Sequence, residues 1–425
     1  MKAVFITNYK KIALTSLRKD ALEIMKAGID AVLPETVLKN KLRLKKNVLL
    51  VDGRKVDLSR YKNIYVVGGG KAAYRTAKFV EGLLENRITD GVVIDVKKGR
   101  LKKIKTYEGT HPYPSEKNVT ATKALISVLK KAKKDDLVLA VVSGGGSSLL
   151  CAPFKTTCAK IKAITKEFFE KGANIREMNI VRKHISGIHG GNLAKIAYPA
   201  DVLGLIFSDV PFRDISLVSS GPTFRDKTTK TDAQKIANKY GIKRFAFLET
   251  PKEVKYFRNV KNVLVSSNND ALKAMKEEAE RRGYKTRVYG GYLKGEAKKL
   301  AQKLIGELGK AKGKVAIIGG GETVVRVRHK RKGGRNLETA MGAISDIPKN
   351  AVIVSMASDG KDNIDGVGGG LVDEAIIKKA ERLKYSYQKF LEGNDSFRFM
   401  KDTGGLIETK RTGTNVSDLV AILRL

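Results

Sequence analysis

The sequence predicts an α/β protein, and two observations lead to this prediction. Short apolar strands alternate with helical segments along most of the 425 residues, which is typical of a parallel sheet that helices cover on both faces. Three of these strands end in a triple glycine, where the backbone can approach a ligand closely. At roughly 150 residues per domain, the length predicts two or three domains.

The N-terminal elements follow from the spacing of the apolar residues. Residues 10–33 have the spacing of a helix with one apolar face. Residues 48–58 predict a hairpin, because Asp52-Gly53 tolerates the positive φ angles of a tight turn. Residues 64–67 form the first fully apolar strand, which ends in Gly68-Gly69-Gly70 and is followed by helix-forming residues.

The same alternation continues to the C-terminus. Further strands are expected at residues 92–94, 137–142, 202–207, 263–265, 287–289, 315–318, 324–328 and 352–355. The second and third triple glycines follow the strands at 137–142 and 315–318. Because strands continue through residues 263–289, we place the domain boundary between 240 and 310, with domains at 1–260 and 261–425.

The net charge is unusual, because 83 Lys and Arg residues oppose 44 Asp and Glu residues and leave +39. Such a charge is typical of proteins that bind nucleic acid through its phosphates. The bases are dispersed, however, and runs such as 97–103 and 130–134 contain no aromatic residue. We therefore expect a basic surface that binds polyanions weakly, and no specific nucleic-acid partner.

The cysteines and the N-terminus predict the compartment. Cys151, Cys158 and four scattered histidines form neither a disulfide framework nor a zinc pattern. The N-terminus lacks the pattern of a signal peptide, and no stretch approaches the roughly 18 apolar residues of a membrane span. We expect a cytoplasmic protein without membrane contact, and a homo-oligomer is compatible with the sequence.

The first glycine loop permits two interpretations. Gly68-x-Gly70-x-x-Ala73 lies between a strand and a helix, and Asp95 follows at the distance of a ribose-binding acid, which is the dinucleotide-binding fingerprint. A nicotinamide-dependent oxidoreductase is therefore one candidate. Lys71 favours another, because a cation in this loop suits a phosphate or a carboxylate and is not part of the fingerprint. The Walker pattern is absent, so a kinase here is not a P-loop kinase.

A series of segments matches, in order, the motifs of a known family. These segments are residues 68–73, 108–114, 143–148, 179–184, 208–211, 220–223, 320–323, 333–336, 359–366 and 411–416. Together they resemble the glycerate 2-kinase family, whose C-terminal region is called the MOFRL domain. The sequence departs from the family pattern at Gly69, where Ala is more usual, and at Lys361-Asp362-Asn363.

The resemblance implies both a fold and a function. It implies a Rossmann-like N-terminal domain with a parallel sheet and a MOFRL-type α/β domain, with the active site in the cleft between them. It also implies transfer of the γ-phosphoryl group of ATP to the 2-hydroxyl of D-glycerate, which gives 2-phosphoglycerate and requires Mg²⁺. D-glycerate and a nucleotide are then the partners, and the glycine loops of both halves are expected to face one cleft.

The site residues follow from these motifs. Lys71, Arg335 and Asp209 are the expected catalytic residues, with Arg326 as a competing match for the arginine. The expected substrate- or ATP-binding residues are Gly68, Gly69, Gly70, Ser143, Gly144, Gly145, Gly146, Ser147, Arg182, Lys183, Gly320, Gly321, Glu322, Thr323 and Asn336. The candidate Mg²⁺ ligands are Asp359 and Asp365. Two alternatives stay open, namely an NAD(P)H-dependent hydroxypyruvate reductase and a basic nucleic-acid-binding protein.

Overall fold

The chain divides into two compact units, each with its own sheet. The structure is a computed structural model. It describes residues 5–208, 214–242, 245–290, 292–309 and 313–425. One unit consists of Pro34–Ser266, and the other combines Met1–Leu33 with Ser267–Leu425. We call them the Pro34–Ser266 unit and the C-terminal unit.

The N-terminal segment belongs to the C-terminal unit, which differs from the division at residue 260 expected from the sequence. Helix α2 (Ser16–Ala31) packs along helix α11 (Asn268–Arg281). The buried Arg18 side chain also donates two hydrogen bonds of 2.6 Å to the carboxylate of Asp373. Residues distant in sequence are thus joined by an apolar face and a buried ion pair.

The Pro34–Ser266 unit contains a six-stranded sheet in which all neighbouring strands are parallel. Its strands are β4 (Asn63–Gly69), β5 (Asp90–Asp95), β6 (Ile104–Glu108), β7 (Asp136–Ser143), β8 (Asp201–Phe207) and β9 (Val260–Ser266). The order β6-β5-β4-β7-β8-β9 is that of a Rossmann-like doubly wound sheet. The strand order reverses between β4 and β7, so a ligand is expected at the carboxyl ends of these two strands.

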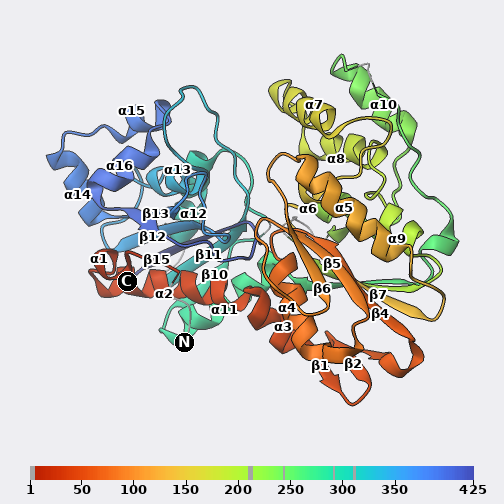
Figure 1. The fold of residues 1–425 in the computed structure, drawn as a ribbon. Coiled ribbons are helices and arrows are strands. Elements are labelled where there is room, and N and C mark those ends of the chain that lie inside the picture. Colours follow the sequence, from red (N-terminus) through yellow and green to blue (C-terminus); the bar gives the residue numbers. More distant parts are fainter. Residues whose placement is uncertain (1–4, 209–213, 243–244, 291, 310–312) are drawn as a thin grey trace. The chain divides into compact units, whose positions relative to one another are not determined.

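Helices cover both faces of this sheet, which explains why its four central strands are almost fully buried (Figure 1). Helices α3 (Pro34–Lys41) and α4 (Ala73–Leu84) pack on one face, and α5 (Glu116–Leu129) and α9 (Asn192–Ala197) on the other. The short helix α6 (Gly146–Leu149) follows β7. Helices α7 (Cys158–Glu170), α8 (Ile175–His184) and α10 (Lys230–Lys239) share a smaller core.

The hairpin expected at residues 48–58 is confirmed. Strands β2 (Val48–Val51) and β3 (Arg54–Asp57) pair antiparallel around Asp52 and Gly53, which have φ angles of 50° and 79°. A third strand, β1 (Leu42–Lys45), pairs with β2 and was not apparent from the sequence. Its four residues alternate between apolar and basic, which is too short a pattern to separate from the preceding helix.

The C-terminal unit contains a mixed six-stranded sheet in the order β10-β11-β15-β12-β13-β14. Its strands are β10 (Lys285–Val288), β11 (Val315–Gly321), β12 (Ala351–Ala357), β13 (Val367–Asp373), β14 (Leu406–Glu408) and β15 (Asp418–Arg424). Only β10 and β11 pair parallel. The prediction of a strand at residues 324–328 is wrong, because only Val324 makes an isolated bridge and the rest of this segment is largely exposed.

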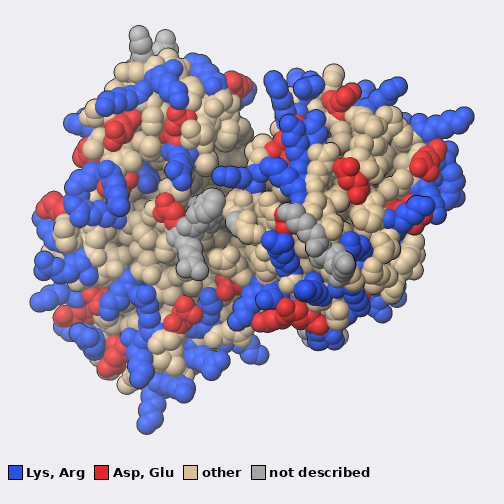
Figure 2. All heavy atoms as spheres, turned by 180° about the vertical axis from the view of Figure 1, so that it is seen from behind, with Lys and Arg blue, Asp and Glu red and all other residues tan. Residues whose placement is uncertain are grey.

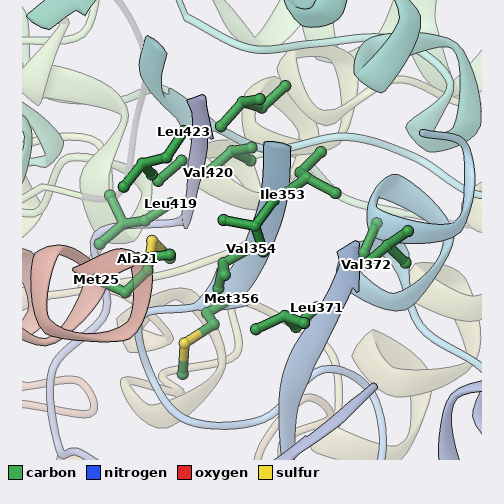
Figure 3. Close-up of a cluster of buried hydrophobic side chains, with 14 of the residues drawn as sticks. Ala21, Met25, Ile353, Val354, Met356, Leu371, Val372, Leu419, Val420 and Leu423 are labelled. Atoms are coloured by element: carbon green, nitrogen blue, oxygen red, sulfur yellow. The ribbon is translucent and has the colours of Figure 1, made fainter. Parts of the chain in front are cut away.

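Helices pack on both faces of this second sheet as well. They are α1 (Tyr9–Ile12), α2, α11, α12 (Ala297–Gly309), α13 (Arg335–Met341), α14 (Glu374–Arg382), α15 (Tyr387–Glu392) and α16 (Ser396–Thr403). Ala21 and Met25 of α2 pack against side chains of β12 and β15 in the buried cluster of Figure 3. Asn336 of α13 instead accepts a 2.6 Å hydrogen bond from Ser355 of β12.

The basic residues are spread over the face of the molecule that Figure 2 shows. Figure 2 shows Lys and Arg side chains distributed across the visible face, with Asp and Glu side chains between them. Among the helices of the described residues, none is both long and apolar enough to span a membrane.

We expect this charge to bind duplex DNA only weakly, because the basic residues are dispersed along the sequence. Retention on immobilised DNA should disappear near physiological salt, at roughly 150 mM. The measurement is elution from DNA and from a non-nucleic polyanion such as heparin across a salt gradient. Submicromolar DNA binding that persists at this salt, without matching heparin binding, would contradict the expectation.

Candidate functional site

The first two glycine loops meet at the point where the strand order of the parallel sheet reverses. Strands β4 and β7 are neighbours, with Gly69 opposite Val142, and each leads directly into a glycine loop. The backbone N–H of Lys71 donates a 2.9 Å hydrogen bond to the carbonyl of Gly144. The N–H of Ala72 donates to Ser143 Oγ at 3.1 Å. The two loops therefore form one connected backbone structure at the expected ligand position.

Gly70 is required by this close approach. Its φ angle is 134°, and a Cβ atom there would lie 2.1 Å from Ser143 Oγ. Any side chain would thus force the loops apart. Gly68 and Gly69 lie within β4 itself, so the first triple glycine is part strand and part loop.

Lys71 lies beside His111, a residue that the sequence analysis did not place in the site. A Cβ atom built on Gly145 would lie 3.3 Å from Lys71 Cγ and 3.0 Å from His111 Cδ2. Lys71, His111 and Gly145, which come from three segments distant in sequence, therefore lie close together. Lys71 is half-buried.

A network of hydroxyl groups connects the second glycine loop to two further motifs. The Oγ atoms of Ser147 and Ser220 lie 3.0 Å apart, and Ser220 donates to Asn179 Oδ1 at 3.0 Å. Ser219 Oγ donates to the carbonyl of Ser143 at 2.7 Å. Ser219 and Ser220 have φ angles of 50° and 55°, which cost energy for residues other than glycine and are common at functional sites.

Asp95 is engaged in a way that disfavours the dinucleotide interpretation. Its carboxylate accepts hydrogen bonds from the backbone N–H groups of Tyr74, at 2.9 Å, and Val96, at 2.6 Å. The residue is 4% exposed, so this acid stabilises the start of α4 and does not face a ribose. Burial raises the pKa of Asp95 to about 6.

We expect the raised pKa of Asp95 to make stability depend on pH. The folded state binds an extra proton between about pH 4 and 6, so this group destabilises the protein as the pH rises through that range. On going from low pH to above pH 6, the free energy of unfolding of Asp95→Asn should therefore change relative to that of the wild type by about 3 kcal/mol in favour of the variant, for a shift of roughly two pKa units. Urea unfolding of both proteins at low and neutral pH measures this difference.

Asp135→Asn is the matched control for this prediction, because Asp135 is exposed and pairs with Lys62 at the surface. It should change the free energy of unfolding by less than about 1 kcal/mol at either pH. An Asp95→Asn effect of equal size at both pH values would show that Asp95 has an ordinary pKa.

Arg182 and Lys183, which the sequence analysis grouped together, have different surroundings in the structure. Arg182 and Ser147 line the same pocket. Lys183 instead forms a buried ion pair with Asp226, with Nζ 3.1 Å from Oδ1. Lys183 therefore stabilises the packing of residues 226–228 against α8, and it does not line that pocket. Asp209 lies outside the described residues, so its expected role stays a prediction.

In the C-terminal unit, Arg335 is held by two carboxylates. Its Nε and Nη2 atoms donate to the two carboxylate oxygens of Asp418 at 2.6 and 3.1 Å. Its Nη1 atom donates to Glu322 Oε1 at 2.7 Å. The contact with Asp418 is buried, whereas Glu322 is about half exposed. Arg326, the competing arginine, is exposed.

Two buried acids complete this network, and sequence reasoning missed both. Asn336 Nδ2 donates to Asp418 at 3.0 Å, and the N–H groups of Asn336 and Leu337 donate to Asp362 at 3.1 and 2.9 Å. Burial raises the pKa of Asp362, although these N–H groups act in the opposite direction. Asp362 lies in the segment where the sequence departs from the family pattern, and Asp418 follows the last motif.

The third triple glycine has a packing role. Gly320 and Gly321 lie within β11, and a Cβ atom on Gly321 would lie 2.2 Å from the carbonyl oxygen of Leu293. The next helix, α13, begins only at Arg335, so no helix N-terminus follows these glycines directly. Thr323 is buried, and of this segment it is Glu322 that contacts Arg335.

The two candidate Mg²⁺ ligands are both close to Arg411. Its guanidinium lies 2.8 Å from Asp365 and 3.8 Å from Asp359, and Lys361 lies 3.0 Å from Asp365. In the part of the chain that the structure describes, no three His, Cys, Asp or Glu side chains form a group that could hold a metal ion. Within the described residues, Asp359 and Asp365 are therefore paired with cations and do not belong to a cluster of metal ligands.

Comparisons with known proteins agree with this architecture. Residues 20–255 match the family model described as "Domain of unknown function (DUF4147)", and residues 315–418 match the model of the MOFRL family. The division between the two models falls between residues 255 and 315, the region in which the two compact units also separate.

The chain is similar over nearly its full length to proteins named as kinases. It is 33% identical to the D-glycerate 2-kinase of Thermotoga maritima, over 95% of this chain and 98% of that protein. It is 34% identical to the glycerate 2-kinase of Pyrococcus horikoshii, over 95% and 96% of the two chains. The crystal structure of the T. maritima glycerate kinase covers 96% of this chain and 100% of its own, with a TM-score of 0.85 and 31% identity. The chain therefore belongs to the glycerate 2-kinase family, with the MOFRL region in its C-terminal part.

Proposed function

We propose that the protein transfers the γ-phosphoryl group of ATP to the 2-hydroxyl of D-glycerate and releases ADP and 2-phosphoglycerate. The observation that supports this most directly is the similarity over nearly the full length of both chains to a D-glycerate 2-kinase. Two connected glycine loops with Lys71 at the reversal point of a parallel sheet are the kind of site such a reaction needs.

In this reaction the 2-hydroxyl oxygen forms a bond to the γ-phosphorus as the bond to the β–γ bridging oxygen breaks. Negative charge spreads over the phosphoryl oxygens during transfer, and fixed cations stabilise it. We assign this role to Lys71, whose backbone is bonded to Gly144 and whose side chain lies beside His111. Backbone N–H groups and hydroxyls of residues 143–147 position the anionic substrates next to it.

Arg335 is the second cation of the proposal. Its contact with Asp418 fixes the guanidinium plane, while its Nη1 contact with the half-exposed Glu322 is the one that an incoming phosphate can replace. Asp209 is the carboxylate that we propose accepts the hydroxyl proton. The expectation that the residues of both units face a shared cleft stays a prediction.

We propose ATP as the phosphoryl donor and Mg²⁺ as the metal ion of this reaction. Mg²⁺ in phosphoryl-transfer sites is typically bound through substrate phosphates and only one or two carboxylates. Since Asp359 and Asp365 are held by Arg411, we propose that Mg²⁺ enters with the nucleotide.

The test is a direct assay with D-glycerate, ATP and Mg²⁺. Enolase added alone converts 2-phosphoglycerate, whereas a 3-phosphoglycerate product requires phosphoglycerate mutase as well. We expect product formation with enolase alone. A requirement for the mutase would contradict phosphorylation at the 2-position, and the absence of any ADP release would contradict the kinase proposal.

A separate assay addresses the reductase. Hydroxypyruvate with NADH or NADPH, without coupling enzymes, should show no oxidation of the nicotinamide, because Asp95 is buried against the start of α4. Turnover at a rate similar to that of the kinase reaction would favour the dinucleotide interpretation.

A further inference from the structure

A small pocket in the Pro34–Ser266 unit contains polar groups that the proposed reaction has not yet used. It lies between the second glycine loop, the end of α8 and the segment that follows α8. Its polar lining includes Ser147, Arg182, Ser186 and His189, and apolar side chains such as Pro112 and Ile185 form much of the rest. The volume is about 20 Å³, so it admits a group the size of a water molecule or a carboxylate, and not a nucleotide.

His189 is buried in this pocket and makes no well-formed hydrogen bond with the described residues. It is 3% exposed, and among the described residues neither Nδ1 nor Nε2 makes a hydrogen bond of good geometry, although the backbone of Gly146 lies near enough to favour the charged ring. Burying unpaired polar groups is unfavourable, so such a side chain is expected to meet a ligand or water. Burial, together with the positive charges of Arg182 and Lys183, lowers the pKa of His189 to about 4. A neutral imidazole offers one donor and one acceptor.

Arg182 supplies a cation to the same pocket. Within the described residues, no carboxylate lies within ion-pair distance of its guanidinium, and burial lowers its pKa to about 10. The neighbouring Lys183 differs, because Asp226 neutralises it. A guanidinium that lines an apolar pocket matches a carboxylate in both charge and geometry, and the low polarity strengthens the pairing.

We propose that this pocket binds the carboxylate of D-glycerate, with Arg182 as its ion-pair partner and His189 as a hydrogen-bonding partner of the same substrate. The inference rests on the proposed function, since it assigns one end of that substrate. Neutral His189 can donate to a carboxylate oxygen and can also accept from a substrate hydroxyl, which suits a hydroxy acid. Ser147 lies in the same lining and joins the pocket to the glycine loop that carries Gly144 and Gly145.

The test compares the wild type with Arg182→Met, using D-glycerate and its neutral analogue D-glyceramide. Affinity is measured by calorimetric titration of the full chain without and with a non-hydrolysable ATP analogue, and KM values are measured for glycerate and ATP. Arg182→Met should weaken glycerate binding by roughly 30- to 5000-fold, the range for removing one partner of a buried charge pair. Binding of D-glyceramide and the KM for ATP should change little.

Arg176→Met is the matched control. Arg176 lies on the same helix, is exposed and lines no part of the pocket, so the same substitution there should leave every measured value unchanged. Melting temperatures establish that the variants fold. Arg182→Lys is a second variant that keeps the charge, and it should recover only part of the glycerate affinity, because an ammonium lacks the planar fork.

His189 is tested by His189→Phe and His189→Asn. The Phe variant replaces the imidazole with an apolar aromatic ring that has no nitrogen, so glycerate binding should weaken by about 10-fold, as for one lost hydrogen bond. The Asn variant keeps a donor and an acceptor and should recover part of this loss. Equal affinity in the Phe variant and the wild type would overturn the role of His189.

The outcomes separate this inference from the proposed function. If the wild type phosphorylates glycerate and Arg182→Met binds it as tightly as the wild type, the inference is overturned and the kinase assignment stands. If the wild type binds glycerate but transfers no phosphoryl group, loss of binding in Arg182→Met still supports the pocket. If the wild type binds no glycerate with or without the nucleotide analogue, both are overturned.

Discussion

Lys71→Met is expected to reduce the turnover of glycerate phosphorylation by about 100- to 1000-fold, the effect typical of removing one group that stabilises charge in a transition state. The melting temperature should change little, because methionine keeps the length of the lysine stem that lies beside Gly145 and His111. Turnover at saturating ATP and glycerate, and thermal unfolding of both proteins, test the two parts of this expectation.

Two further variants sharpen the Lys71 prediction. Lys71→Arg should restore only part of the activity, since the guanidinium fork is wider than an ammonium. Lys78→Met removes an exposed lysine from α4, the helix that follows the same loop, and should leave turnover unchanged. Near-native turnover in a folded Lys71→Met protein would show that Lys71 takes no part in catalysis.

Arg335→Met is expected to destabilise the protein by about 3–5 kcal/mol, because it leaves the buried Asp418 carboxylate without its cation. Asp362 lies close enough to raise the pKa of Asp418 further, so the unpaired charge would also face a second acid. Urea unfolding measures the loss. Arg398→Met, which removes a partly exposed pair with Asp402, should cost less than about 1 kcal/mol.

A double variant separates the structural role of Arg335 from its proposed catalytic role. Arg335→Met with Asp418→Asn removes both charges, so most of the lost stability should return. Activity should stay low if Arg335 stabilises the phosphoryl group. Recovery of activity together with stability would mean that Arg335 acts only by holding Asp418 in place.

Much of the fold and part of the site were readable from local sequence patterns. Fully apolar strands identified β4, β7 and β8 and the parallel sheet, because such strands are buried on both faces whatever their partners are. The hairpin was readable for a similar reason, since Asp52-Gly53 determines its own turn. Lys71 and the first two glycine loops were identified because their motifs are contiguous in the chain.

Only the tertiary structure decided the contacts between segments that are distant in sequence. It placed residues 1–33 in the C-terminal unit through α2, and it paired Arg335 with Asp418 and Lys183 with Asp226. It also gave Asp95 a capping role and placed His189 in a pocket where, among the described residues, its ring makes no well-formed hydrogen bond. The physical reason is that a side chain's partners, burial and pKa depend on which strands and helices pack together, and local sequence patterns do not determine that packing.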